Sequence, residues 1–149
     1  MNKRIPAMTL CLFMLGLAAG AVADLNGFIA DLNLRAKADL DGFTAQVSAQ
    51  FGVPLPQVKV VLADVPAPAD AFLCFQLGVL TQKPVDAVLA AFKLHKGKGW
   101  GAVAQELGLK PGSAEFKALK NGDFALTGKA AGKAAPEHAK GKGKGKKKH

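Results

Sequence analysis

Apolar residues recur at helical spacing from the first carboxylate, Asp24, as far as Gly122. In residues 24–51 they lie three or four positions apart, which is the period of one face of an α-helix. The two runs are Leu25, Phe28, Ile29, Leu32 and Ala36, then Leu40, Phe43, Val47 and Phe51. The pattern predicts a helix over residues 24–51, with a break near Ala38 as the alternative.

A near-repeat supports this interpretation. The pentapeptide DLNGF at 24–28 recurs fifteen residues later as DLDGF at 39–43. Fifteen residues are close to four helical turns, so both copies present Leu and Phe to roughly one face. Gly27 and Gly42 weaken the helix. The repeat is too short to indicate a solenoid.

Residues 52–64 allow two interpretations. Gly52-Val53-Pro54 ends the preceding pattern, and the stretch QVKVVL that follows is rich in β-branched residues, as strands are. No partner strand is evident elsewhere, however, and Pro56 suits the first position of a helix. We therefore favour a short helix over 56–64 and keep the strand as the alternative.

The next segments complete an all-helical prediction. Residues 69–80 are apolar nearly all round, which is typical of a central buried helix. Pro84 begins another helix, and the sequence KGKG at 96–99 ends it. We predict the all-α class: a small irregular bundle of about six mostly short helices. Its predicted core is Phe72, Phe75, Leu89, Phe92 and Trp100.

The segment 99–122 has the outline of a DNA-binding helix-turn-helix. Ala104 and Gly108 have the spacing of the small residue at the helix crossing and the glycine in the turn. The second helix does not fit, because Lys117 takes a position that should be apolar and few side chains suit a base edge. We interpret Ala104 and Gly108 as structural and predict that Trp100 is buried over the helix junction. DNA binding stays as the weakest alternative.

The same stretch, GKGWGAVAQELGLKPGSAEFKALKNG preceded by KPVDAVLAAF, resembles the C-terminal part of small exported bacterial proteins that have no assigned function. The resemblance covers roughly residues 54–122. It implies an all-helical exported domain and offers no catalytic residues to transfer. Residues 24–51 and the C-terminal segment lie outside it.

Residues 1–23 have the parts of a secretory signal peptide. A short positive start at Lys3 and Arg4 precedes an apolar run, which ends in the small residues Ala21-Val22-Ala23. The alternative is an uncleaved membrane anchor, since the apolar stretch approaches the ~20 residues of a spanning helix. Pro6 and two glycines interrupt it, so we expect cleavage after Ala23 and a periplasmic or secreted product without a further membrane segment.

The positive charge lies almost wholly at the C-terminus. Residues 24–127 hold ten basic and ten acidic residues, whereas residues 128–149 hold eight lysines and one glutamate. We predict that residues 128–149 form a disordered tail, because their only apolar side chains are small ones, the last at Ala139, which cannot offset the entropy of ordering. The predicted anion-contacting residues are Lys140, Lys142, Lys144, Lys146, Lys147 and Lys148.

The sequence offers no evident catalytic or cofactor chemistry. No phosphate-binding or dinucleotide-binding glycine motif is present, and His95, His138 and His149 are scattered. After cleavage Cys74 is the only cysteine, and its apolar neighbours predict a buried thiol. We expect no enzyme, no cofactor and no metal.

Three domains and two leading functional hypotheses result, with DNA binding as the weakest alternative. The predicted domains are the signal peptide 1–23, the helical domain 24–127 and the tail 128–149. The first hypothesis is weak, electrostatic binding of the tail to an anionic envelope surface or an acidic protein. The second is a periplasmic protein-binding module, which uses an apolar groove between helices while the tail serves only solubility.

Overall fold

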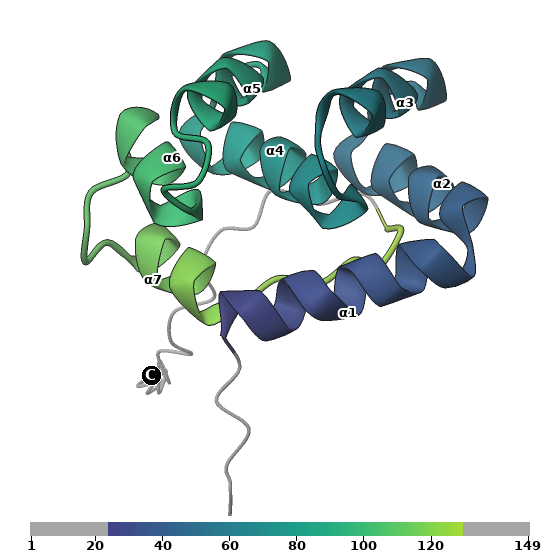
Figure 1. The fold of residues 1–149 in the computed structure, drawn as a ribbon, viewed down its shortest axis with the longest axis horizontal. Helices are drawn as coiled ribbons and strands as arrows, with labels where there is room; N and C mark the ends of the chain where they lie inside the picture. Colours follow the sequence, from purple (N-terminus) through teal and green to yellow (C-terminus); the bar gives the residue numbers. More distant parts are fainter. Residues whose placement is uncertain (1–23, 130–149) are drawn as a thin grey trace, which may run out of the picture.

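The computed structural model describes residues 24–129, and within them the chain forms seven helices and no strand (Figure 1). The all-helical prediction is confirmed. The helices are α1 (Leu25–Ala38), α2 (Leu40–Phe51), α3 (Leu55–Asp64), α4 (Pro68–Thr81), α5 (Val85–Leu94), α6 (Trp100–Glu106) and α7 (Ala114–Asn121). Residues 24–51 break into two helices at Asp39, and residues 55–64 form a helix rather than a strand.

The near-repeat DLNGF/DLDGF marks two helix starts. Asp24 Oδ1 accepts a hydrogen bond from Gly27 N at 2.7 Å, and Asp39 Oδ1 accepts one from Gly42 N at 2.8 Å. Each aspartate therefore caps the first turn of its helix. A Cβ at Gly42 would overlap the Asp39 carboxylate, so the glycine makes room for the cap. The break at Asp39 is built into the sequence.

Helices α2–α3 and α4–α5 form two hairpins with equivalent turns. The first helix of each ends at a left-handed residue, Gly52 with φ 64° and Gln82 with φ 55°. The next N–H bonds back to the helix, from Val53 to Ser48 O at 3.1 Å and from Lys83 to Gly78 O at 3.0 Å. This is a Schellman termination.

The two hairpins match position by position at an offset of thirty residues. A proline follows each turn as the N-cap of the second helix, Pro54 for α3 and Pro84 for α5. The equivalent buried pairs are Phe43 and Leu73, Thr44 and Cys74, Val47 and Leu77, and Val58 and Val88. The pairing is structural, since the side chains at most of these positions differ.

Helices α6 and α7 form a third hairpin with a longer turn. Gly108 has φ 95°, and Leu109 N donates to Ala104 O at 2.9 Å, which repeats the same termination. Ser113 then caps α7, because its Oγ accepts from Phe116 N at 3.1 Å. Ala104 is fully buried where α6 meets its neighbours.

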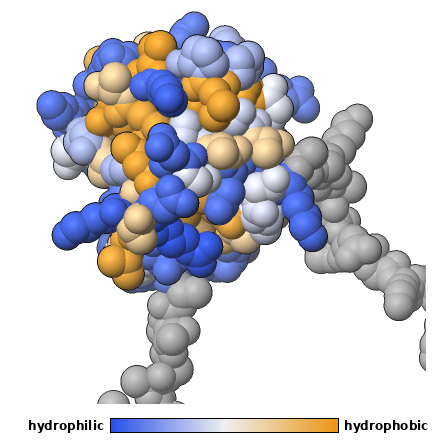
Figure 2. Space-filling model, turned by 90° about the vertical axis from the view of Figure 1, so that its right-hand side faces the viewer, coloured by the Kyte–Doolittle hydropathy of each residue, from blue (hydrophilic) through white to orange (hydrophobic). Residues whose placement is uncertain are grey.

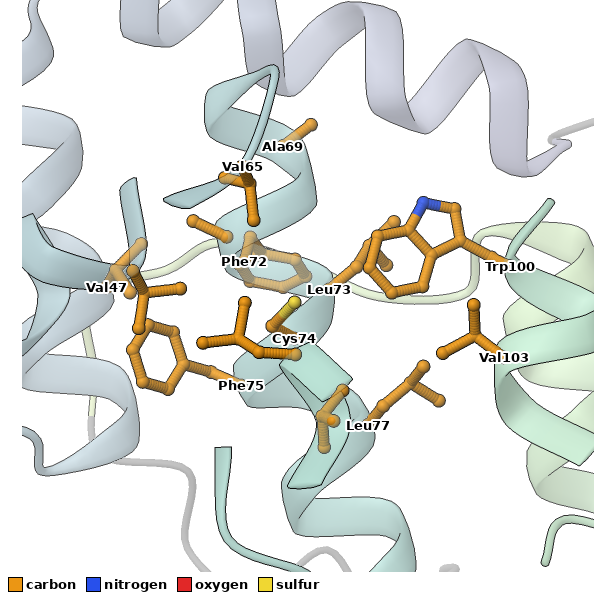
Figure 3. Close-up of a cluster of buried hydrophobic side chains, with 14 of the residues drawn as sticks. Val47, Val65, Ala69, Phe72, Leu73, Cys74, Phe75, Leu77, Trp100 and Val103 are labelled. Carbon is orange, nitrogen blue, oxygen red and sulfur yellow. The ribbon is translucent and has the colours of Figure 1, made fainter. Parts of the chain in front are cut away.

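Helix α4 is the centre of the molecule. Helix α1 runs along one side of it, and α3 and α5 lie next to each other on the opposite side (Figure 1). Phe72 on α4 is fully buried and meets Phe28 and Phe51 edge-on, each with ring centroids 5.5 Å apart. Figure 3 shows Phe72, Leu73 and Leu77 within this core. Their burial is the main source of stability.

Residues 123–127 return along α1 and end against α2 (Figure 1). Gln50 on α2 is 6 % exposed and holds this segment at two points. Its Nε2 donates to Ala125 O at 2.9 Å, and its Oε1 accepts from Thr127 N at 2.8 Å. Leu126 between them is buried. The chain is thus fixed to the helical body as far as Thr127.

The surface combines charged side chains with several exposed apolar ones. On the face in Figure 2, apolar side chains gather toward the upper left with hydrophilic side chains around them. The large exposed apolar residues are Leu34, Leu40, Leu55, Val60, Val79 and Leu94. Among the described residues, none of the helices has the length and apolar content required to cross a membrane.

Candidate functional site

Trp100 joins three helices at the start of α6. Its ring is 7 % exposed and stacks on Phe92 of α5, with centroids 4.9 Å apart and an interplanar angle of 23°. Its Nε1 donates to Asp70 Oδ1 on α4 at 3.3 Å. Figure 3 shows the ring next to Leu73 of the central helix. Trp100 therefore fastens α6 to α4 and α5.

Asp70, which accepts the hydrogen bond from this tryptophan, lies one turn before Cys74 on α4. Burial raises the pKa of the Asp70 carboxyl, and the hydrogen bond from Trp100 opposes that rise. Burial, and secondarily the Asp70 charge, raises the pKa of the Cys74 thiol to about 12. The side chain of Cys74 is fully buried. A thiol in these surroundings stays protonated at neutral pH, which is the opposite of what a nucleophile needs.

An open cleft of about 830 Å³ lies next to Trp100, between α6, α7 and the first turn of α1. We call it the α6 cleft. Trp100 and Phe116 line it together with small residues of α6. Polar residues of both charges also line it: Asp24, Asn26, His95, Lys98, Gln105, Glu106 and Lys120. Its size lies within the roughly 300–1,000 Å³ of small-molecule sites.

His95 connects the end of α5 to this cleft. It caps α5, and its Nε2 lies 3.1 Å from Glu106 Oε2 on α6. The contact becomes an ion pair when the ring is protonated. Its Nδ1 is buried and has no hydrogen-bond partner among the described residues. His95 thus links the end of α5 to α6.

A second depression, of about 300 Å³, lies between the turns of the first two hairpins. We call it the turn groove. Phe51 and Val53 line it from the first hairpin, and Val79 and Val85 line it from the second. Phe51 stacks on Phe75 below, with ring centroids 5.7 Å apart. Gln57, Lys83 and Asp86 complete the lining with polar side chains.

Gly78 shapes the turn groove through the backbone. A Cβ at this position would lie 3.0 Å from Lys83 O, so a larger residue would push the α4–α5 turn outward. The equivalent residue in the first hairpin is Ser48, whose Oγ donates to Val53 O at 2.6 Å. The Ser48 hydroxyl tightens the α2–α3 turn by bonding to Val53 O, whereas the α4–α5 turn is tight because Gly78 has no side chain to displace Lys83 O.

The remaining titratable groups of the described chain are dispersed. No cluster of three or more His, Cys, Asp or Glu side chains in residues 24–129 has the arrangement of a metal site. The ion pairs Asp31–Arg35 at 2.8 Å and Asp64–Lys93 at 3.3 Å are largely exposed. Each contributes at most about 1 kcal/mol.

The predicted site residues divide into two groups. Trp100 and Ala104 are buried, and Gly108 adopts the left-handed conformation at the end of α6. The predicted signal peptide 1–23 lies outside the described residues, and so do the predicted anion contacts Lys140, Lys142, Lys144, Lys146, Lys147 and Lys148. The α6 cleft and the turn groove were not predicted, because residues distant in sequence build them.

Comparisons with protein-family models, with curated proteins and with solved structures find no match to this chain.

Proposed function

We propose that the protein is an exported, non-enzymatic tether, whose lysine-rich C-terminal segment binds anionic envelope components. The helical body is then a charge-balanced platform that the segment holds near the surface. The observation that carries this proposal is the division of charge: ten basic and ten acidic residues in 24–127, against eight lysines and one glutamate in 128–149.

The described end of the body supports the proposal. Gln50 holds residues 125–127 on α2, and Gly128 lies against Gln46 of the same helix. The lysine-rich segment consequently begins at a defined place on the body, and any attachment through it would start from the α2 side. Each lysine close to an anionic membrane surface contributes about 1 kcal/mol.

The proposal of export has two further supports. One is the signal-peptide pattern of residues 1–23. The other is the cap of α1: Asp24 would be the first residue after cleavage, and its side chain completes the first turn. A chain that begins at Asp24 keeps that cap. An intact mass that starts at Met1 in purified envelope protein would contradict the proposed cleavage.

Replacing the six lysines at 140, 142, 144, 146, 147 and 148 tests the tether in the full mature chain. The six-glutamine variant should lose its binding to vesicles with anionic lipids, and the matched six-arginine variant should keep it. Binding of the unchanged chain should weaken steeply between low salt and 0.15 M, where the Debye length is about 8 Å. Equal binding of the two variants would show that the body carries the contact.

The α6 cleft favours a second candidate function, a module that binds another protein or a small ligand. Its volume of about 830 Å³ and its mixture of aromatic and polar walls are the supporting observations. Replacing Gln105, an exposed cleft residue, with Trp would obstruct it. Envelope retention that falls with Gln105→Trp and survives the six-glutamine change would favour this function over the tether.

A further inference from the structure

The turn groove exposes apolar side chains at the junction of two hairpins. Val79 is 53 % exposed, and Phe51, Val53 and Val85, which line the groove with it, are partly exposed. Leu55, which follows Pro54 at the start of α3 and does not line the groove, is 45 % exposed. An apolar depression with protruding valine and leucine side chains has the form of a surface that a partner covers.

The charges at the groove indicate which partner fits it. Lys83 and Asp86 both line the groove, three residues apart in the chain, and both are exposed. Neither forms an ion pair with another described residue. In a contact between two identical copies about a two-fold axis, each patch faces itself. A rim with charges of one sign would repel its own copy, whereas this rim carries one charge of each sign.

We infer that the turn groove is the interface of a two-fold symmetric dimer of this chain. The axis passes between Lys83 and Asp86, so Lys83 of each copy pairs with Asp86 of the other. Val79 of each copy enters the groove of the other and contacts Phe51 and Val53. Leu55 closes the edge of the apolar contact. Lys83 and Asp86 determine the orientation, and the valine contributes the buried apolar area.

Charge exchange tests this arrangement more sharply than disruption alone. Lys83→Asp gives a copy with two negative rim residues, and Asp86→Lys gives a copy with two positive ones. Two copies of the same variant should repel each other. An equimolar mixture of the two variants should form heterodimers, because residues 83 and 86 that face each other across the axis then have opposite charges. Lys110→Asp, in the α6–α7 turn outside the groove, is the matched control for a single charge change.

The measurement is sedimentation equilibrium of the full mature chain and its variants, from micromolar to millimolar concentration at low salt. The unchanged chain and Lys110→Asp should dimerise alike, and each rim variant alone should dimerise at least about tenfold more weakly. Their mixture should recover the dimer, and Val79→Asp should abolish it. Circular dichroism melts establish that each variant is folded.

Three results would overturn the inference. The first is an unchanged chain that stays monomeric over the whole range. The second is a pair of rim variants that dimerise as strongly as the unchanged chain. The third is a mixture of folded rim variants that remains monomeric, which would leave the groove to a partner other than a second copy.

Discussion

The helical body and the lysine-rich segment differ in apolar content and in charge. In the body, contacts between residues far apart in the chain stabilise one arrangement, and Gln50, for example, bonds to residues more than seventy positions away. Basic and acidic residues in the body are equal in number. In residues 128–149, lysine, glycine and alanine dominate and Ala139 is the last apolar side chain. The body has specific contacts and no net charge, whereas the segment has a large positive charge and only small apolar side chains.

If the segment attaches the protein as we propose, this difference predicts that stability and attachment are separable. Changes in the body should alter the free energy of unfolding and leave attachment intact at temperatures where the chain is folded. Changes in the segment should do the reverse.

Trp100→Ala should have the largest effect. The ring is almost fully buried, stacks on Phe92 and donates to Asp70. Removing a buried aromatic side chain costs about 3–5 kcal/mol, a large part of a small domain's stability. Urea unfolding measures it. Trp100→Phe keeps an aromatic ring but lacks the indole N–H donor, so it should lower the free energy of unfolding by less. A midpoint unchanged by Trp100→Ala would mean that the ring is exposed and free to stack on a ligand.

The thiol of Cys74 should be nearly inert in the folded chain. Its pKa is raised from 9.0 to about 12, so the thiolate population at pH 8 falls roughly a thousandfold. Alkylation should therefore be fast in urea and very slow in buffer, as mass spectrometry can follow. Because the folded pKa lies above the unfolded one, this group's contribution to stability is full below pH 9 and declines toward pH 12. Cys74→Ala should remove that part of the alkaline decline.

The two equivalent turns should respond oppositely to substitution. Gly52 has φ 64°, so Gly52→Ala places a Cβ in the left-handed region at a cost of about 1 kcal/mol or more. Gln82 is a non-glycine residue in the same left-handed region, at φ 55°, so the chain already has this cost in the α4–α5 turn. Gln82→Gly should therefore stabilise the chain by up to about 1 kcal/mol, less the greater entropy of glycine in the unfolded state. Thermal melts of both variants are the measurement, and a loss of stability in both would contradict the equivalence.

Asp70→Asn should have a small stabilising effect at neutral pH. Burial raises the pKa of Asp70, so the folded state keeps the proton to higher pH than the unfolded state. This group therefore stabilises the fold below the unfolded pKa and loses that contribution as pH rises through the folded pKa. Asparagine still accepts from Trp100 without a charge to bury. Asp70→Ala is the control, and the orphaned indole N–H should make it less stable by about 1–3 kcal/mol.

The six-glutamine change in the segment should have no effect on unfolding. None of the six lysines belongs to the described body, whose last fixed contacts are those of Gln50 with residues 125–127. Thermal midpoints of the changed and unchanged chains should agree within error. A shift would show that the segment interacts with the folded body, and the separation would then fail.

The sequence predicts the helical class well because apolar spacing is a local signal. The buried helix predicted at 69–80 is observed as α4, and the helix predicted after Pro84 is observed as α5. Periodicity favours one helix over residues 24–51, with a break near Ala38 as the alternative, because Leu and Phe of both repeats fall on roughly one face. The role of the repeated aspartates as caps depends on backbone angles that periodicity does not report.

Local sequence patterns do not predict the α6 cleft, the turn groove or the polar contacts between helices. The hairpin turns are equivalent although glycine occupies one left-handed position and glutamine the other. Asp70 meets Trp100 and His95 meets Glu106 only after α6 packs against α5. These contacts arise from tertiary packing, which the order of residues in the chain does not display.

The central claim is that the lysine-rich segment suffices for attachment. The most direct test compares a synthetic peptide of residues 128–149 with the full mature chain, by titration with vesicles of fixed anionic lipid content over a salt series. The two should bind with affinities within about threefold of each other and with the same salt dependence, since salt screens the same lysines. A peptide that binds at least about tenfold more weakly than the full chain would contradict the claim and move the contact to the helical body.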